Sequence, residues 1–429
     1  MSIESCIVKR TKCERENDMP RQEFNILVFN CGSSSLTLKI FHVNNTKAIE
    51  QIFSGKAHRV GVTGTEPSFI ETSLNGKVEK KIIPLKNHSE AAAVALENVK
   101  NSRIPIHYVG HRFVHGGDHF QRSVFLSNDI MKQLKMCLLL APLHNPSSFS
   151  VILECKRSLP QVQQYVAFDN AFHSSIPPIA FTYGLPKKII KKYGFRKYGF
   201  HGLSYSYVVK EAARFLQTPL DKLRIVACHL GTGGSSVAAI KEGHSIDTSM
   251  GYTPLSGLVM STRSGDLDPI LALYLMAVYG YRGEELNDIL NRKSGFLGIS
   301  SFSSDIRDII KHIEEKDEDQ SELALNMYIH RLKKYIGSYI VALGGIDVLA
   351  FTDDIGVNSW EVREGVCSNM ECWGMKLDEK ANHMATKDKI SILNSKNSKV
   401  NILTIPTEEE LVICWEGINL IGDNHDAAV

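Results

Sequence analysis

Two similar strand–turn–strand segments, about 200 residues apart, restrict the fold more than any other feature of the sequence. In the first, the apolar run Phe24–Asn30 leads into the turn CGSSS, after which Leu36–Phe41 alternates between apolar and polar residues. In the second, Arg224–Leu230 leads into GTGGSS and the short apolar run Val237–Ile240. Apolar runs bounded by Gly and Ser predict strands joined by tight turns. The chain therefore contains an internal repeat at the scale of a domain.

Both turns consist of small residues that offer backbone N–H groups and hydroxyls. If the two turns face each other across a cleft, these donors would hold a multiply charged anion such as a polyphosphate. The alternative is a pair of unrelated β-hairpins, because small-residue turns are common in proteins. The pattern alone leaves both interpretations open.

The rest of the chain alternates predicted helices with short strands. Helical spacing is found in Ser89–Lys100, Asn128–Leu140, Ser147–Ser158, Leu267–Gly280, Gly283–Asn291 and Glu318–Ala342. Residues 365–399 are polar and loop-rich, and Ile402–Ile405 predicts a short closing strand. Because strands precede helices in both halves, we expect an α/β protein with mixed sheets flanked by helices.

Composition limits the partners and the location of the protein. The chain has 429 residues and a formal net charge of +2. A protein whose main partner is nucleic acid or an anionic membrane is expected to have a much stronger positive electrostatic field. No apolar run approaches the ~20 residues of a membrane span. Residues 1–23 predict a flexible, charged leader without a secretory pattern. Nine scattered cysteines without a zinc-type spacing predict reduced thiols in a cytoplasmic protein.

Five polar loops carry the residues that handle anions. Their sequences are HRFVHGG (111–117), LHNP (143–146), FDNAFH (168–173), YGFHG (198–202) and STRSGDLDP (261–269). Each loop alone has a structural interpretation, such as a buried histidine or a surface ion pair. Together they supply the Arg, His and Asp groups of phosphoryl transfer, which depends on positioning and charge neutralisation. The P-loop, protein-kinase and G-x-S-x-G patterns do not occur, so a phosphotransferase would have to use the paired hairpins.

Nine motifs resemble those of the acetate kinases, and they occur in that family's order. They are NCGSSS, HRFVHGG, LAPLHNP, FDNAFH, YGFHG, DTSMGYTPLSGL, TRSGDLDP, SGFLGISSFSSDIRD and PTEEEL, between Phe24 and Ile421. The resemblance implies a two-domain actin/hexokinase-like (ribonuclease H-like) fold and a homodimer. It also implies Mg²⁺-dependent, reversible phosphoryl transfer between ATP and acetate, giving acetyl phosphate and ADP. The implied domains are 24–170 with a C-terminal return at 401–429, and a nucleotide and dimerisation domain at 171–400.

The resemblance also implies roles for the polar side chains of the acyl site. Arg112 would bind the acetate carboxylate, for which its planar guanidinium is suited. Arg263 and His201 would stabilise the transferring phosphoryl group, with His144 as a further active-site group. Asp169 has a proton donor or acceptor role in the family. Because acetate is already ionised at pH 7, we expect Asp169 to orient an arginine or the hydrated metal instead.

The remaining implied residues hold the metal, the methyl group and the nucleotide. Asn30 and Glu409 would position Mg²⁺ directly or through water. Val114, Leu143, Phe200 and Pro254 would form a small apolar pocket for the methyl group. The implied nucleotide-binding residues are Thr37, Lys39, His229, Leu230, Gly231, Thr232, Gly233, Asp305, Ile306, Arg307, Asp353, Asp354, Ile355, Gly356 and Val357.

The sequence departs from the family mainly on the nucleotide side. Thr37 stands for the usual Lys after SSSL, Thr232 for the Asn of HLGNG, and the loop FTGGIGENS has become FTDDIGVNS. The new Asp353 and Asp354 bring negative charge toward a polyanion, which predicts weak ATP binding. Lys39 shares a strand face with Thr37, so we expect it to reach back toward the phosphates.

These departures leave several functions open beside acetate kinase. A propionate or butyrate kinase would differ only in the volume of its acyl pocket. A second alternative is a changed phosphoryl donor such as pyrophosphate. A third is a weakly active or non-catalytic paralogue.

Overall fold

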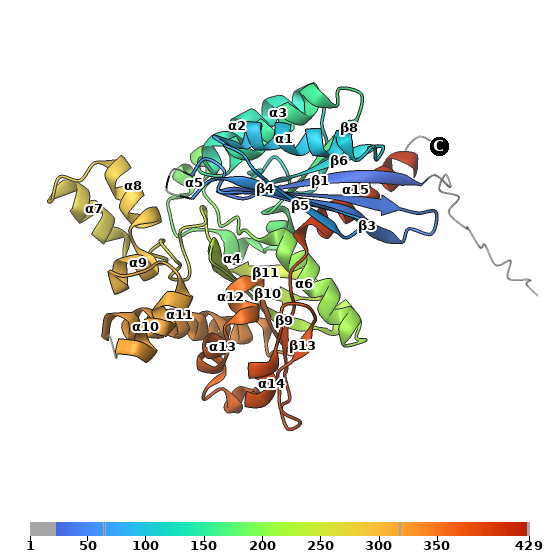
Figure 1. Ribbon diagram of the computed structural model, residues 1–429. Coiled ribbons are helices and arrows are strands. Elements are labelled where there is room, and N and C mark those ends of the chain that lie inside the picture. The colour runs from blue at the N-terminus through green and yellow to red at the C-terminus, as the bar shows by residue number, and fades with distance from the viewer. Residues whose placement is uncertain (1–22, 63, 65, 317–318, 427–429) are drawn as a thin grey trace, which may run out of the picture.

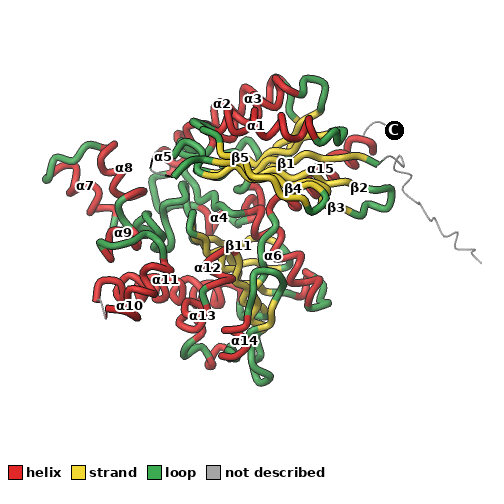
Figure 2. Tube along the Cα trace, in the orientation of Figure 1, coloured by secondary structure: helices red, strands yellow, loops and turns green. Residues whose placement is uncertain are grey.

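The computed structural model describes residues 23–62, 64, 66–316 and 319–426. The predicted leader therefore lies outside the described residues, except for Glu23. The described chain forms two sheets, each covered by helices, which lie above and below one another in Figure 1. Figure 2 separates the sheets in yellow from the helices in red.

The first sheet has eight strands in the order β5-β4-β3-β2-β1-β6-β8-β7. Its strands are β1 (Phe24–Cys31), β2 (Ser35–Val43), β3 (Ile49–His58), β4 (Phe69–Leu74), β5 (Lys77–Ile82), β6 (Tyr108–Phe113), β7 (Val124–Phe125) and β8 (Gln163–Phe168). β1 to β5 form an antiparallel meander, whereas β6 pairs with β1 and β8 in parallel. Parallel pairing brings the carboxyl ends of β1, β6 and β8 to one edge, where the polar loops begin.

Helices cover both faces of the first sheet, which explains the unbroken apolar run of β1. On one face, Leu27 and Phe29 pack in the same core as α1 (His88–Asn101) and α3 (Asn145–Ser158). On the other, Ile26 and Val28 pack against α15 (Glu409–Asp426). A strand buried on both faces needs apolar residues at every position, without alternation.

The second sheet has six strands in the order β11-β10-β9-β12-β14-β13. They are β9 (Arg224–Gly231), β10 (Gly234–Lys241), β11 (His244–Thr248), β12 (Val348–Thr352), β13 (Ser391–Ile392) and β14 (Asn401–Thr404). One face of β9 packs in a core with α11 (Asp319–Leu343) and α13 (Trp360–Cys367), and the other packs with α6 (Gly202–Phe215).

The C-terminal return to the first sheet is shorter than the 401–429 predicted. Residues Asn401–Thr404 form β14, which pairs in parallel with β12 of the second sheet. Of the described residues in this segment, those of α15 return to the first sheet. The segment 405–408 thus connects the two halves.

The remaining elements are short or peripheral. They are α2 (Asn128–Met136), α4 (Pro178–Phe181), α5 (Lys187–Tyr193), α7 (Pro269–Ala277), α8 (Gly283–Arg292), α9 (Gly295–Ser300), α10 (Ile306–Lys316), α12 (Asp353–Asn358), α14 (Glu379–Met384), η1 (Cys137–Leu140), η2 (Ala171–Ser175), η3 (Leu220–Lys222) and η4 (Glu371–Trp373). None of the helices described here combines the length and apolar character needed to cross a lipid bilayer.

Candidate active site

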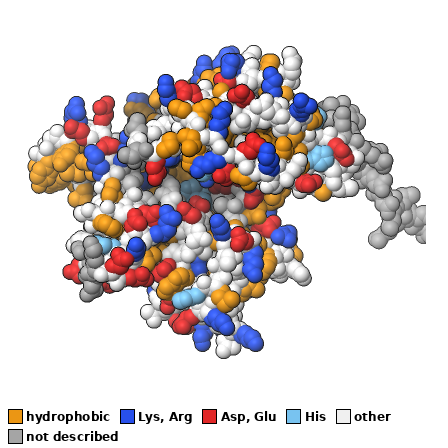
Figure 3. Space-filling model, in the orientation of Figure 1, with side chains coloured by type: hydrophobic (Ala, Val, Ile, Leu, Met, Phe, Trp, Pro, Cys, Tyr) orange, Lys and Arg blue, Asp and Glu red, His pale blue; other side chains and the backbone are white. Residues whose placement is uncertain are grey.

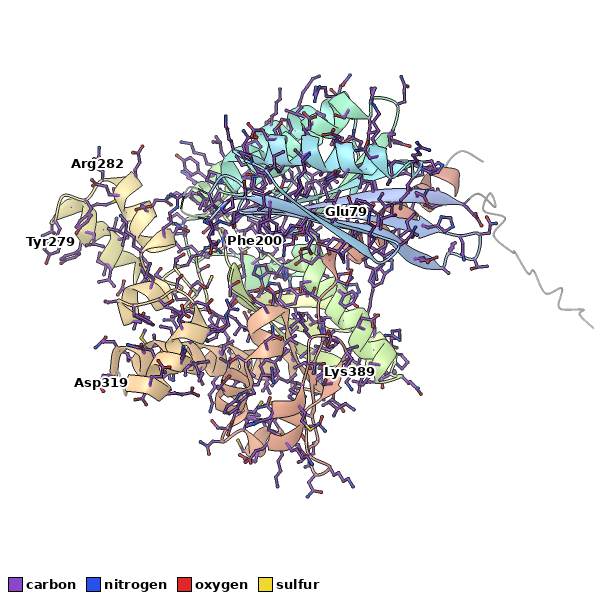
Figure 4. The ribbon with its side chains drawn as sticks, in the orientation of Figure 1. Glu79, Phe200, Tyr279, Arg282, Asp319 and Lys389 are labelled. Atoms are coloured by element: carbon purple, nitrogen blue, oxygen red, sulfur yellow. The ribbon has the colours of Figure 1, made fainter. Side chains whose placement is uncertain are left out.

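The two small-residue turns line one cavity, as expected if they face each other. The cavity has a volume of about 630 Å³ and is bordered by Gly32–Ser35 of the first turn and Thr232–Gly234 of the second. This main cavity is lined by the residues predicted for the acyl site and the metal: Asn30, Arg112, Val114, His144, Asp169, Phe200, His201, Pro254, Arg263 and Glu409. The predicted nucleotide residues His229 and Asp353 also line it. Figure 4 labels Phe200 where the upper and lower parts of the ribbon meet.

Arg112 is the centre of a hydrogen-bonded network on the floor of the main cavity. Its guanidinium donates from Nη2 to Asp169 Oδ2 at 2.6 Å, from Nε to both Asp169 oxygens, and from Nη1 to Asn30 Oδ1 at 2.9 Å. Burial opposes the charge, yet Asp169 and Glu409 raise the pKa of Arg112 above its ordinary value. Asp169, which is 1% exposed, thus fixes the orientation of the guanidinium.

Asn30 extends this network to two glutamates. Its Nδ2 donates to Glu409 Oε2 at 3.0 Å and to Glu410 Oε1 at 2.8 Å. Both glutamates lie in the first turn of α15. The start of this helix therefore meets the end of β1 at Asn30. The Oδ1 and Nδ2 atoms of the Asn30 side chain are thus both hydrogen-bonded, which fixes the orientation of the amide.

His201 and Arg263 meet beside the second turn. A Cβ placed on Gly234 would lie 3.2 Å from Arg263 Nη1 and 3.6 Å from His201 Nε2. His201 has a left-handed backbone (φ 59°), and its Nδ1 forms a hydrogen bond with Ser236 Oγ at 2.8 Å. The next residue must be Gly202, because a Cβ there would lie 2.0 Å from the Asp169 carbonyl oxygen. Strained backbone of this kind is frequent where a side chain must point into a site.

The pKa values of the imidazoles around the main cavity are shifted in different directions. Burial and the neighbouring His229, Arg112 and Arg263 charges lower the pKa of His201 well below its usual value. Burial, Arg263 and Arg112 also lower the pKa of His144, to about 4. Both rings are therefore neutral at pH 7 and can donate a hydrogen bond to an anion without adding charge.

The pKa of His229 shifts in the opposite direction because Asp353 lies against it. Its Nε2 is 3.1 Å from Asp353 Oδ2, and its ring stacks on that of His201 with centroids 3.9 Å apart. Burial opposes a charge on His229, but the Asp353 carboxylate raises its pKa. The same contact lowers the pKa of Asp353 although burial opposes it.

Arg263, beside the second turn, is a cation whose charge is available to a ligand. Among the described residues, its recorded hydrogen-bond acceptors are the Pro254 carbonyl oxygen and, at 3.9 Å, Met260 Sδ. Burial lowers its pKa. A buried guanidinium without a carboxylate partner is suited to receive an anionic ligand.

A second and a third cavity adjoin the main one. The second, of about 270 Å³, has apolar walls from Ile306, Ile310 and Ile355, with Arg307 and Asp354 at its border. The third, of about 620 Å³, takes in the predicted pocket residue Leu143 and Asp305. Leu143 therefore borders the third cavity, while Val114 and Phe200 belong to a buried apolar cluster beside the main one.

Six predicted nucleotide residues lie outside these three cavities: Thr37, Lys39, Leu230, Gly231, Gly356 and Val357. Lys39 forms ion pairs with Glu408 and, at 3.4 Å, with Glu410. The carbonyl oxygens of Gly356 and Val357 accept hydrogen bonds from the buried Arg363, which closes the end of α12.

Several residues of the site were not predicted from the sequence. Glu410 and Thr407 line the main cavity, and Ser236 orients His201. The acidic run in PTEEEL could have drawn attention to Glu410, but three adjacent glutamates do not reveal which of them faces a site. Ser236 is the last residue of the turn GTGGSS, but nothing in the sequence indicates that its hydroxyl would orient His201.

Known proteins resemble this chain over nearly its whole length. Residues 25–415 match the acetokinase family. An acetate kinase of Thermoanaerobacter pseudethanolicus is 42% identical, over 92% of this chain and 98% of its own. The crystal structure of Entamoeba histolytica acetate kinase has a TM-score of 0.83 at 43% identity, covering 92% of this chain and 99% of its own. A Francisella tularensis propionate kinase has a TM-score of 0.82 at 34% identity, covering 92% and 98%.

These relatives confirm the predicted α/β architecture of the actin/hexokinase-like class, with two mixed sheets flanked by helices. They also confirm the class of reaction, because it is common to the relatives matched along this length. The chain belongs to the acetokinase family, whose enzymes are phosphotransferases with a carboxyl group as acceptor.

Proposed function

We propose that this protein transfers a phosphoryl group reversibly between ATP and acetate, giving acetyl phosphate and ADP. The observation that carries the proposal is the shared lining of the main cavity, where Arg112, Arg263 and His201 meet the two turns beside a small apolar cluster. A carboxylate near Arg112 would place its methyl group toward Val114 and Phe200. Arg263 and His201 would then neutralise and orient the phosphoryl oxygens in transit.

The residues on the cavity floor fit the Mg²⁺ that the family uses. Mg²⁺ prefers oxygen ligands and keeps several waters, so one or two carboxylates and the donor phosphates suffice. The described residues contain no cluster of three or more His, Cys, Asp or Glu side chains arranged to hold a metal alone. Asn30 and Glu409 would thus hold a hydrated ion, which would neutralise phosphate charge.

Charge around Asn30 agrees with a divalent ion. The linked carboxylates are Asp169, Glu408, Glu409 and Glu410, and the linked cations are Arg112 and Lys39. Four carboxylates against two cations leave two negative charges in a partly buried region. A divalent cation would balance them.

One observation favours a second candidate, in which the phosphoryl donor is not a nucleotide. Thr232 lines both the main and the second cavity. Its N–H donates to Asp354 Oδ1 at 3.0 Å and its hydroxyl to Asp354 Oδ2 at 2.9 Å. A nucleotide reaching from one cavity to the other would have to break these bonds, whereas pyrophosphate would stay within the main cavity.

A coupled assay of acetyl phosphate formation with ATP, GTP and pyrophosphate tests both candidates. Turnover with ATP above the other donors supports the first candidate, and turnover with pyrophosphate alone supports the second. Absence of acetyl phosphate with all three donors, from correctly folded protein, would leave the non-catalytic paralogue as the remaining interpretation.

The acyl-chain preference follows from the apolar cluster. Val114 lines the main cavity at 6% exposure, so Val114→Ala should enlarge the space beyond the methyl group. We expect kcat/KM for propionate relative to acetate to rise about tenfold or more, since one methylene in an apolar pocket is worth roughly 1–3 kcal/mol. Leu143→Ala is the matched control, because Leu143 borders the third cavity. Equal ratios in the wild type and Val114→Ala would contradict the pocket.

We also propose that the protein is a homodimer, and that α7 lies in its interface. Large apolar side chains are exposed along 267–281: Leu267, Ile270, Leu271, Leu273, Tyr274, Met276, Val278, Tyr279 and Tyr281. Figure 3 shows this surface as a continuous orange area at the left, where Figure 4 labels Tyr279. No residue of α7 is buried, although the helix is apolar all round. Such a helix is normally covered by another surface.

Glutamates on this surface should separate the dimer. For Leu273→Glu/Tyr279→Glu, light scattering after size exclusion should give the monomer mass at concentrations where the wild type is dimeric. Val78→Glu/Ile82→Glu on β5 is the matched control, since those side chains are equally exposed. A monomeric wild type, or a dimer that survives the α7 substitutions, would contradict the proposal.

The cytoplasmic location inferred from the cysteine pattern is likewise a proposal. Immunodetection of the protein in fractionated cells tests it.

A further inference from the structure

Lys39 occupies a position that the proposed reaction does not explain. It lies on β2, opposite Val28 of β1, and its side chain is 16% exposed. Its ammonium group pairs with Glu408 and with Glu410, instead of projecting into the main cavity. Burial opposes the charge, but the two glutamates raise the pKa of Lys39 above its ordinary value.

Glu410 connects Lys39 to the floor of the main cavity. Its Oε1 accepts from Asn30 Nδ2, while its Oε2 lies 3.4 Å from Lys39 Nζ. The other partner of Lys39, Glu408, is not among the cavity residues. Among the described residues, Lys39 therefore pairs with the two carboxylates that flank Glu409 and forms no ion pair with Glu409 itself.

We propose that Lys39 is a positioning residue which neutralises Glu408 and Glu410, so that Glu409 alone is presented to a single divalent cation. The inference rests on the proposed metal site at Asn30 and Glu409. Without Lys39, Arg112 would be the one cation left to compensate the charge of the four linked carboxylates. The unpaired Glu408 and Glu410 would then attract a divalent ion more strongly or hold a second one.

Binding of Mn²⁺, a paramagnetic substitute for Mg²⁺, tests this directly without turnover. Free Mn²⁺ is measured by electron paramagnetic resonance during titration of the full-length protein. Lys39→Met should bind Mn²⁺ about tenfold more tightly or take up a second equivalent, because the charge that compensates Glu408 and Glu410 is lost. Lys39→Arg should bind as the wild type does.

A charge-restoring variant separates this role from a merely structural one. Lys39→Met/Glu408→Gln removes one cation and one carboxylate, so Mn²⁺ binding should return to the wild-type level. Lys81→Met, on the exposed strand β5, is the control for loss of a lysine at a distance. Thermal unfolding of each variant checks that the fold is retained.

The outcomes distinguish the two proposals. Equal Mn²⁺ binding by the wild type and folded Lys39→Met would overturn the role of Lys39 and leave the metal site standing. Failure of every variant to bind Mn²⁺ would overturn both. The expected Mn²⁺ pattern in a protein that makes no acetyl phosphate would support Lys39 and refute the proposed reaction.

Discussion

Arg263→Ala is expected to lower kcat/KM by about a hundredfold or more while leaving the melting temperature unchanged or slightly higher. The guanidinium faces the main cavity and has no carboxylate partner among the described residues. Removing a donor that acts on charge developing in the transition state typically costs 10²- to 10³-fold in rate. Removing an unpaired buried cation does not leave another charge stranded, so the fold should not suffer.

Steady-state kinetics in the direction of acetyl phosphate formation, with thermal unfolding of the same samples, checks this prediction. Arg157→Ala is the control, because the Arg157 side chain is 72% exposed and pairs with Glu154 of its own helix, α3. Near wild-type kinetics in Arg263→Ala would show that the anion binds elsewhere. Arg112→Ala should differ from Arg263→Ala by also destabilising the protein, since it strands the buried Asp169.

Asp353→Gly/Asp354→Gly should lower the KM for ATP by about tenfold or more. The two carboxylates now hold His229 Nε2 and the N–H and hydroxyl of Thr232. Removing them frees these donors for phosphate and removes two like charges, and each charge-assisted hydrogen bond is worth about 1.5–3 kcal/mol. Glycine also suits position 353, where the backbone is left-handed (φ 63°).

Initial rates over a range of ATP concentrations, with acetate saturating, give the comparison. Asp353→Asn/Asp354→Asn keeps the size of both side chains without their charge. It therefore separates charge repulsion between the aspartates and ATP from the blocking of the His229 and Thr232 donors by these side chains. Asp388→Gly, at an exposed loop position, is the control for loss of an aspartate elsewhere. An unchanged KM for ATP in the double glycine variant would mean that the two aspartates do not limit nucleotide binding.

The central strands were predictable because they are buried on both faces. β1 and β9 consist of apolar runs ended by Gly and Ser, and both observed strands end one residue after the predicted ones. β5 could not be predicted, because all six of its residues are exposed and its sequence, KVEKKI, has no apolar stripe. Arg112 was expected in a loop, yet it lies on β6, since parallel pairing with β8 extends this strand beyond its apolar start.

The sequence predicted which residues line the main cavity better than it predicted the contacts between them. Motif positions placed Arg112, Asp169 and His201 around one cavity, which their order along the chain and the parallel strand ends explain. The partner of Lys39 could not be inferred, because Glu408 and Glu410 are separated from it by more than 360 residues. The contacts of Asp353 and Asp354 depended on side-chain rotamers, about which spacing says nothing.

The route of the chain between the two halves gives the site a mechanical property. One crossing follows β8 and runs from Asp169 to His201, and the other follows β14 and ends at Glu409. Both crossings act as hinges if the cleft opens, and each hinge ends in a residue of the main cavity. A rotation of a few degrees between the sheets would therefore pull His201 away from Asp169, and at the same time move the second turn away from Asn30 and Glu409, which both stay with the first sheet. Closure of the cleft and assembly of the reactive groups are therefore one and the same movement. A substrate that stabilises the closed cleft also brings the reactive groups together.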